Sequence, residues 1–301
     1  PKPVPGAGEY LIRVHATTVN RTDCANLRAK PDIMRLTMGL FRPKKHILGT
    51  DFAGVVEQSG RDTSRFQPGD RVFGMDDSGL CSQAEYLVIS EKKAICIIPD
   101  GISFEQAAAS AEGTHYALNF INKVKLYSGQ KVMVNGGTGA IGSAMIQLLV
   151  HFGAEVTASC RPEHKEAVRK MGAKRTIDYT QTDFTKDNER FDYVFDSVGK
   201  STFFKCKPLL KKKGVYISSE LGPYIQNPLL ALLTPLFGGK QVRFPLPVNI
   251  QRSLDLIHKL LGSSEFNPMI DRSYRLWEVS EAYIYVESGQ KAGNVLLVIT
   301  P

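Results

Sequence analysis

Three spaced glycines form the pattern with the clearest chemistry in this chain of 301 residues. Gly137, Gly139 and Gly142 follow the short apolar segment Lys131–Asn135 and precede apolar residues at helical spacing. A Gly-x-Gly-x-x-Gly pattern between a strand and a helix is the fingerprint of a dinucleotide site. The first glycine permits a tight turn, the second lets backbone approach a pyrophosphate, and the third lets helix and strand pack closely. The alternative is a glycine-rich turn that binds nothing.

The end of the next predicted strand decides which nicotinamide coenzyme such a site prefers. An NAD site carries Asp or Glu there, about 20 residues beyond the glycines, to bind the ribose 2′-hydroxyl. The segment from Thr157 to Arg161 contains no carboxylate. Ser159 can donate to a phosphate oxygen, and Arg161 can pair with it bidentately. These residues favour NADPH. The alternative is that Arg161 and Lys165 are solvated charges at a helix start.

These groups need elements that position them, and the first hundred residues supply strands. Gly and Pro separate short segments of alternating or apolar character. The predicted strands are Tyr10–His15, Phe52–Gln58, Arg71–Met75, Ala84–Ile89 and Ala94–Ile98.

From about residue 100, predicted strands and helices alternate, which indicates a doubly wound parallel sheet. The predicted strands are Lys131–Asn135, Glu155–Ser159, Arg175–Ile177, Tyr193–Ser197 and Val215–Ser219. The predicted helices are Ser103–Asn122, Ile141–Phe152, Glu163–Met171, Thr202–Leu210 and Val248–Leu261. The tail Asn294–Ile299 is predicted to be a strand that rejoins the first sheet. The sequence thus predicts an α/β nucleotide domain inserted into a β-rich domain built from both chain ends.

Composition narrows the class of protein. The net charge is +8, but no nucleic-acid module accompanies it, so we expect no nucleic-acid partner. No apolar run reaches the roughly 18 residues that a spanning helix needs, and no signal peptide is recognised. The five cysteines are widely spaced and form no Cys-x-x-Cys pair, which is typical of a reducing compartment and predicts a cytoplasmic protein.

Several segments carry a family resemblance. Ile47–Val56 reads ILGTDFAGVV, Pro68–Gly74 reads PGDRVFG, and Ala84–Tyr86 and Ile98–Ala109 are similarly typical. The chain resembles the medium-chain dehydrogenase/reductase superfamily, in its zinc-free quinone oxidoreductase branch, and within that the chloroplast-envelope quinone oxidoreductase and alkenal/one reductase type. The resemblance implies a Rossmann domain inserted into a GroES-like domain. We expect residues 1–99 plus 245–301 to form the GroES-like catalytic domain and residues 100–244 the Rossmann domain.

The resemblance also implies that no metal is bound. Zinc members of the superfamily need Cys and His ligands around an open tetrahedral position. The corresponding positions here are Asn20 and Thr50, and the lobe of four close cysteines is absent. His46 and His115 are isolated histidines. Without a Lewis acid to polarise an alcohol, reduction of electrophilic acceptors is favoured over alcohol oxidation.

The remaining site residues are assigned by resemblance. Asn20 is predicted to hydrogen-bond the substrate oxygen or carboxamide, with a capping or turn asparagine as the alternative. Lys165 aligns with a lysine directed at the 2′-phosphate, and Tyr179 with a tyrosine near the adenosine phosphate. The residues predicted to contact the coenzyme are Thr114, Gly137, Thr138, Gly139, Ala140, Ile141, Ser159, Arg161, Lys165, Tyr179, Ser197, Gly222 and Asn294. Because family members commonly form dimers, we expect a homodimer.

The sequence therefore predicts a zinc-independent, NADPH-dependent oxidoreductase that transfers hydride to quinones or α,β-unsaturated carbonyl compounds. Two alternatives are a non-catalytic nucleotide-binding protein and a metal-free carbonyl or alcohol oxidoreductase. The apolar stretch Pro228–Phe237 has three interpretations: a buried loop or subunit contact, a lid over a lipid-like acceptor, or a contact with a membrane surface.

Overall fold

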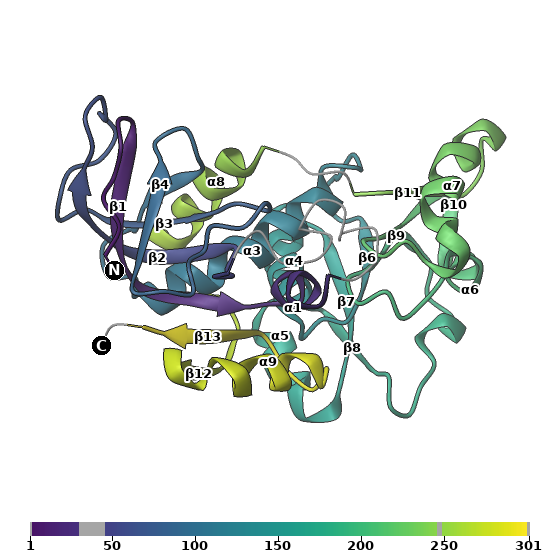
Figure 1. Cartoon of the computed structure of the whole chain (residues 1–301). Coiled ribbons are helices and arrows are strands. Elements are labelled where there is room, and N and C mark those ends of the chain that lie inside the picture. The colour runs from purple at the N-terminus through teal and green to yellow at the C-terminus, as the bar shows by residue number, and fades with distance from the viewer. Residues whose placement is uncertain (1, 30–45, 246–248, 300–301) are drawn as a thin grey trace. The chain divides into compact units, whose positions relative to one another are not determined.

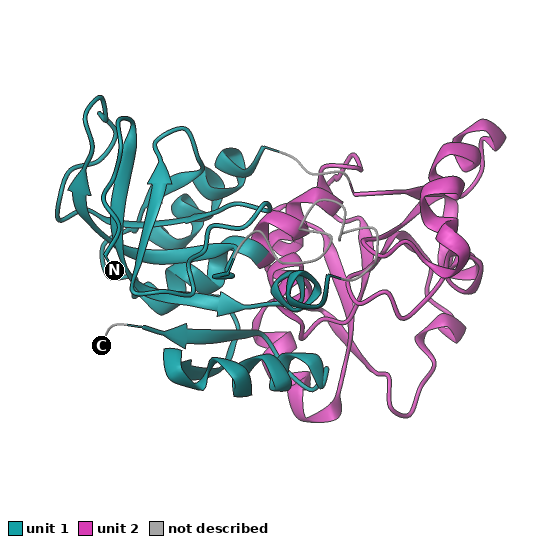
Figure 2. Ribbon diagram, viewed as in Figure 1, with its two compact units in different colours: residues 1–112, 249–301 teal, residues 113–248 magenta. Residues whose placement is uncertain are grey.

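The computed structural model describes residues 2–29, 46–245 and 249–299. The chain divides into two compact units, residues 1–112 with 249–301 and residues 113–248 (Figure 2). We predicted domain boundaries at 99/100 and 244/245. In the structure both boundaries lie later in the chain, at 112/113 and 248/249. The first boundary lies inside helix α3 (Phe104–Ile121), because this helix begins in one unit and continues into the other.

The first unit is built on a seven-stranded, mainly antiparallel sheet in which β1 is the long central strand (Figure 1). The strand order is β12-β13-β1-β2-β3-β5, and β4 also pairs with β1. The tail strand β13 runs antiparallel to β1, with Val295 opposite Val19, so the predicted return of the C-terminal strand is confirmed. The strands are β1 (Glu9–Val19), β2 (Asp51–Ser59), β3 (Arg71–Met75), β4 (Tyr86–Ser90), β5 (Ile95–Ile97), β12 (Ile270–Arg275) and β13 (Asn294–Val298).

Helices and an apolar core complete the first unit. Alternate residues of β1, such as Tyr10, Ile12 and Val14, point into one core cluster together with Phe52 and Val72. This period-two burial is what fixes the register of the strand. The helices are α1 (Arg21–Arg28), the start of α3, η6 (Leu276–Glu278), α8 (Ile250–Gly262) and α9 (Val279–Glu287).

The second unit holds a six-stranded sheet in the order β11-β10-β9-β6-β7-β8, and every described pair in it is parallel. This confirms the predicted doubly wound parallel sheet. The chain starts the sheet at the centre with β6 and moves first to one side and then to the other, so β6 lies between β7 and β9, at the switch point where such sheets bind ligands. The strands are β6 (Lys131–Asn135), β7 (Glu155–Cys160), β8 (Arg175–Asp178), β9 (Phe191–Asp196), β10 (Leu210–Ser218) and β11 (Gln241–Arg243).

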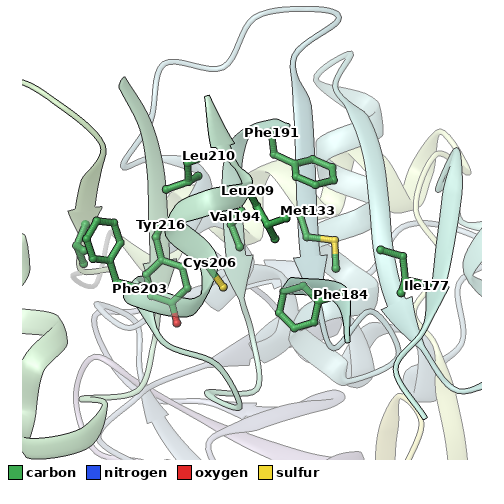
Figure 3. Packing of buried hydrophobic residues seen from close by; sticks show 11 residues of the cluster. Met133, Ile177, Phe184, Phe191, Val194, Phe203, Cys206, Leu209, Leu210 and Tyr216 are labelled. Carbon is green, nitrogen blue, oxygen red and sulfur yellow. The ribbon is translucent and has the colours of Figure 1, made fainter. Parts of the chain in front are cut away.

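Helices cover this sheet, and apolar residues of strands and helices share one core. Met133 and Val194 of the central strands pack with Phe203, Leu209 and Tyr216 in a cluster of buried residues (Figure 3). The helices are α4 (Ala140–His151), η1 (Pro162–His164), α5 (Lys165–Lys170), η2 (Phe184–Lys186), α6 (Phe203–Cys206), η3 (Lys207–Leu209), η4 (Pro223–Ile225), α7 (Gln226–Leu233) and η5 (Thr234–Phe237).

The stretch Pro228–Phe237 is helical, so its interpretation as a buried loop is wrong. Pro228 stands in the first turn of α7, where its missing N–H costs no helical hydrogen bond. Apolar side chains of α7 and η5 are more than half exposed, among them Leu232, Leu236 and Phe237. No helix in the described part of the chain is both long and apolar enough to cross a membrane.

Candidate functional site

The glycine turn connects β6 to α4 and contains four glycines, each with a different structural role. Gly136 has the left-handed backbone, with φ of +87°, so the tight turn falls on Gly136 and not on Gly137 as predicted. Gly137 has no room for a side chain, because a Cβ there would lie 2.9 Å from the Cβ of Ala158. A Cβ on Gly142 would lie 2.0 Å from the carbonyl oxygen of Gly136. The structure thus gives Gly142 the close packing of helix and strand that we predicted for it.

The start of α4 is open on the side where an anion would approach. Gly139 is the N-cap residue, and no side chain of the described residues caps the helix. Within the described part of the chain, a Cβ on Gly139 would have one neighbour within 4 Å, the carbonyl oxygen of Gly136 at 3.7 Å. The first N–H groups of a helix have no partners within it, and they carry the positive end of the helix dipole. The N–H of Gly139 already donates to the carbonyl of Gly136 at 3.1 Å, but the rest of the backbone from Thr138 to Ile141 can hold a phosphate group.

A buried polar network lies behind this turn and holds its shape. The Ser159 hydroxyl donates to Oδ1 of Asn135 at 2.7 Å and accepts from the N–H of Gly136 at 2.9 Å. Nδ2 of Asn135 donates to Asp196 at 2.9 Å, and the Ser197 hydroxyl donates to the carbonyl of Asn135 at 2.9 Å. Ser159 has no exposed surface. This geometry corrects the predicted role of Ser159, because its proton is used inside the protein and the residue supports the turn.

Cationic and phenolic side chains gather where β7 and β8 end. Nε of Arg161 donates to the Tyr179 hydroxyl at 3.0 Å, and Nζ of Lys165 lies 3.6 Å from Asp178. The side chains of Arg161 and Lys165 are 46% and 39% exposed, so both can reach a ligand. The hydroxyl and amide of Thr180 hold the pKa of Asp178 below its usual range, so this carboxylate stays charged and competes for Lys165. The structure thus places three of the residues predicted to contact the coenzyme, Arg161, Lys165 and Tyr179, where β7 and β8 end.

The other predicted coenzyme contacts are distributed over both units. Thr114 in α3 is 1% exposed, and its hydroxyl has no hydrogen-bond partner among the described residues. Gly222 follows β10 with φ of +71°. Asn294 opens β13 in the first unit, where its Nδ2 donates to the carbonyl of Met269 at 3.0 Å. An orphaned buried hydroxyl such as that of Thr114 is the kind of group a bound ligand satisfies.

Asn20 is the N-cap of α1, which is the alternative we gave for it. Its Oδ1 accepts from the N–H of Asp23 at 2.8 Å, and a carboxylate oxygen of Asp23 accepts from the N–H of Asn20 at 3.1 Å, which completes a capping box. Its Nδ2 donates to the Thr50 hydroxyl at 2.8 Å. The two residues at the positions of zinc ligands in zinc-dependent members are therefore bonded to each other.

Buried carboxyl groups surround this pair, and no local sequence pattern predicts their burial. Asp51 and Asp23 have no exposed surface. Burial raises the pKa of Asp51 to about 6, against the hydrogen bonds from Thr18 and Thr17 that favour the charged form. Burial, together with the charge of Asp51, raises the pKa of Asp23 to about 8. The only signal was that both residues stand within three positions of Asn20 or Thr50 in a β-rich segment.

Comparison with known proteins identifies the family. A model of the alcohol dehydrogenase GroES-like domain matches residues 6–117, and a model of zinc-binding dehydrogenases matches residues 171–297. Together they match more than half of the chain. The chain belongs to the medium-chain dehydrogenase/reductase superfamily and is of the quinone oxidoreductase type. As a member, it is an oxidoreductase with a nicotinamide coenzyme.

Individual relatives agree with this assignment. The chain is 29% identical to the NAD(P)H oxidoreductase RTN4IP1, mitochondrial, of Mus musculus, over 96% of this chain and 81% of the relative. It is also 29% identical to the 2-methylene-furan-3-one reductase of Solanum lycopersicum, over 96% and 71%. Its fold is similar to that of the quinone oxidoreductase from Coxiella burnetii, with a TM-score of 0.87, 25% identity, and coverage of 100% and 93%.

Proposed function

We propose that this chain catalyses the NADPH-dependent reduction of quinones or α,β-unsaturated carbonyl compounds without zinc. The observation that carries the proposal is the phosphate-binding geometry at the carboxyl end of the parallel sheet. The uncapped start of α4 can hold the pyrophosphate, and Arg161, Lys165 and Tyr179 can hold a 2′-phosphate at the end of β7 and β8. The orphaned Thr114 hydroxyl supports a further contact with the coenzyme.

When bound, the reduced coenzyme supplies hydride to the acceptor, and water supplies one proton, giving the saturated carbonyl compound or the quinol. The residues of this chain bind and orient. Gly136 and Gly139 shape the turn, and the network of Asn135, Ser159 and Asp196 keeps it rigid. The side chains of Arg161 and Lys165 select the phosphorylated coenzyme.

The donor set at Asn20 and Thr50 supports the zinc-free part of the proposal. An amide and a hydroxyl are poor zinc ligands compared with Cys and His. The amide nitrogen of Asn20 donates to the Thr50 oxygen at 2.8 Å, so the two side chains at these positions are hydrogen-bonded to each other. Among the described residues, no group of three or more His, Cys, Asp or Glu side chains is arranged to hold a metal ion.

The test is NADPH oxidation by the purified protein with three sets of acceptors: quinones, enals and saturated aldehydes. We expect turnover with quinones or enals, at a rate that the addition of EDTA does not lower. Turnover with saturated aldehydes alone would favour the carbonyl oxidoreductase. Tight NADPH binding without turnover of any acceptor would favour a non-catalytic nucleotide-binding protein.

We also propose a homodimer in which α7 and η5 lie at the subunit contact. The support is the exposed apolar surface of these helices, which is large for a face that meets only water. More than half of each side chain is exposed for Leu229, Leu232, Leu233, Leu236 and Phe237. Leu232→Glu should convert a dimer to a monomer in light scattering, whereas Ile284→Glu, at an exposed apolar residue of α9, should not.

The cytoplasmic location stays a proposal, supported by five free cysteines. The mouse relative carries the word mitochondrial in its name. Cell fractionation of the native host, with NADPH oxidation as the marker, distinguishes the two compartments.

A further inference from the structure

A chain of hydrogen bonds in the first unit runs from a buried carboxylate to the Thr50 hydroxyl. Asp51 has no exposed surface, and its Oδ2 accepts from the Thr18 hydroxyl at 2.5 Å. The Thr18 oxygen lies 3.4 Å from Nδ2 of Asn20, and this same nitrogen lies 2.8 Å from the Thr50 oxygen. Four side chains from two separate segments thus form one connected path.

The direction of every bond in this path is fixed. An ionised carboxylate only accepts hydrogen bonds, so Thr18 gives its single proton to Asp51 and must accept from Asn20. The orientation of the Asn20 amide is settled by the cap, because the N–H of Asp23 requires the oxygen on its side. The amide nitrogen therefore donates to Thr50. Since Thr50 accepts this bond, its own proton remains to be donated.

No acceptor for the Thr50 proton is found among the described residues, although the side chain is only 1% exposed. The hydroxyl accepts one bond and keeps one proton to donate, so a ligand oxygen can complete its bonding. The backbone at this position is fixed, because the N–H of Asp76 donates to the Thr50 carbonyl at 2.8 Å. The preceding Gly49 has φ of +106°, and a Cβ there would lie 2.2 Å from Oγ of Ser82.

We propose that the Thr50 hydroxyl donates a hydrogen bond to the carbonyl oxygen of the acceptor, and that Asn20 is the positioning residue that directs it. This inference rests on the proposed reduction of quinones or enones. Hydride addition to such an acceptor moves an electron pair onto the carbonyl oxygen, and a preorganised donor stabilises the charge that develops there. Thr50 keeps its proton, and the proton that completes the product comes from water.

The proposal changes the role we predicted for Asn20. Both polar atoms of its side chain are used inside the first unit, by the N–H of Asp23 and by the hydroxyls of Thr18 and Thr50. No donor remains on Asn20 for a substrate oxygen. Asn20 therefore acts on the acceptor only by fixing the direction in which the Thr50 hydroxyl donates.

The test compares Thr50→Val with Thr50→Ser, and uses Thr63→Val as a control. Val removes the hydroxyl at nearly constant volume, and Ser restores it. Loss of one such donor typically lowers kcat by about 100-fold or more, and we expect that loss for Thr50→Val with an unchanged dissociation constant for NADPH. Thr50→Ser should recover most of kcat. Thr63 donates to the carbonyl of Gly60 outside this path, so Thr63→Val should keep the wild-type kcat.

A double-mutant cycle tests the positioning role of Asn20. Asn20→Asp keeps an N-cap residue but replaces the amide donor by an acceptor, which draws the Thr50 proton inward. We expect it to lower kcat on its own and to add little to the loss in Thr50→Val. Additive losses would overturn the role of Asn20, and an unchanged kcat in Thr50→Val would overturn that of Thr50.

Failure of the proposed function can be distinguished from failure of this inference. If the wild-type protein reduces no acceptor, calorimetric titration with 1,4-naphthoquinone in the absence of NADPH replaces the kinetic measurement. Weaker binding by Thr50→Val than by wild type would then support the donor role although the reduction is refuted. Equal binding by the two proteins would overturn the donor role as well.

Discussion

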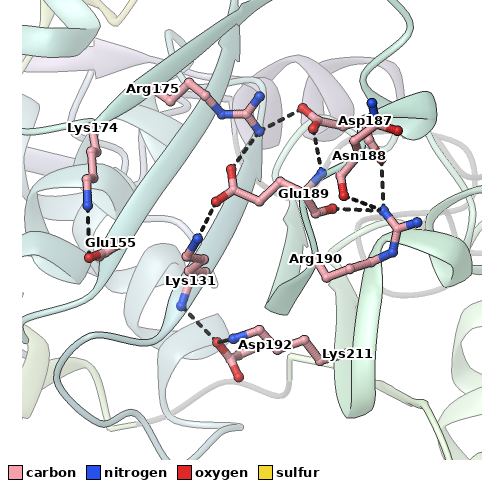
Figure 4. Close-up of polar contacts among 10 residues, drawn as sticks. All are labelled: Lys131, Glu155, Lys174, Arg175, Asp187, Asn188, Glu189, Arg190, Asp192 and Lys211. Carbon is pink, nitrogen blue, oxygen red and sulfur yellow. Dashed lines mark hydrogen bonds and ion pairs between the residues drawn. The ribbon is translucent and has the colours of Figure 1, made fainter.

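The two ends of the parallel sheet in the second unit differ in how closely their charged side chains are paired. At the amino ends of the strands, cations and carboxylates form close pairs (Figure 4). Lys131 lies 2.6 Å from Glu189, Arg175 lies 2.7 Å from Asp187, and Lys211 lies 2.7 Å from Asp192. At the carboxyl ends the nearest carboxylates are farther away, 3.9 Å from Arg161 and 3.6 Å from Lys165.

The difference shows how one sheet separates stability from binding. The charges at the amino ends are satisfied within the chain, and exposed pairs of this kind contribute only about 0–1 kcal/mol each. The carboxyl ends keep loosely paired cations and uncapped helix N–H groups, which a phosphorylated ligand can satisfy. Substitutions at the two ends should therefore have separable effects on coenzyme binding.

The largest effect on the binding of both coenzymes should come from Gly142→Ala. The new Cβ would lie 2.0 Å from the carbonyl oxygen of Gly136, so the glycine turn must move. Such overpacking costs about 1–3 kcal/mol of folding stability, and we expect NADPH binding, measured by fluorescence titration, to weaken roughly tenfold or more. Gly239→Ala is the matched control, because a Cβ there would have a single neighbour among the described residues, the carbonyl oxygen of Phe237 at 3.9 Å. Equal binding by both variants would show that the turn does not hold the coenzyme.

Arg161→Ala should have the next largest effect, confined to one coenzyme. A hydrogen bond to a charged group contributes about 1.5–3 kcal/mol, so NADPH binding should weaken roughly 10- to 100-fold while NADH binding changes little. Arg175→Ala removes an arginine from the other end of the sheet and should leave both affinities unchanged. Equal losses for NADPH and NADH in Arg161→Ala would contradict the assignment of the 2′-phosphate site.

A smaller effect concerns pH and contrasts a surface carboxylate with a buried one. Lys174 lowers the pKa of Glu155 at the amino end of the sheet. The stability that this pair contributes is therefore lost as the pH falls through the pKa that Glu155 has in the folded state. Burial raises the pKa of Asp23 to about 8, so the folded state binds a proton that the unfolded state releases, and this contribution falls as pH rises from about 4 to 8. In thermal unfolding, Asp23→Asn should therefore gain stability relative to wild type between pH 6 and pH 8. A constant difference between the two proteins over this range would refute the raised pKa.

Much of the fold follows from local sequence patterns. The strands Arg71–Met75 and Lys131–Asn135 were predicted with their observed bounds, and the predicted helix Ser103–Asn122 differs from α3 by one residue at each end. Apolar periodicity and Gly or Pro at the ends of segments carry this information. The elements that escaped prediction, β11, β12, α1, α7 and α9, are short or polar, or contain a proline, so their patterns are weak and neighbouring elements stabilise them.

The site residues divide in the same way. The sequence by itself determined the glycine turn and the lack of a carboxylate at the end of β7, because residue type and local spacing suffice for both. The family resemblance added that Asn20 and Thr50 stand at the positions of zinc ligands. Only the tertiary structure decided that Ser159 supports the turn and that Asn20 donates to Thr50, 30 positions away. Hydrogen-bond partners from distant segments, and the burial that shifts the pKa of Asp23 and Asp51, arise when the chain folds and leave no mark in local spacing.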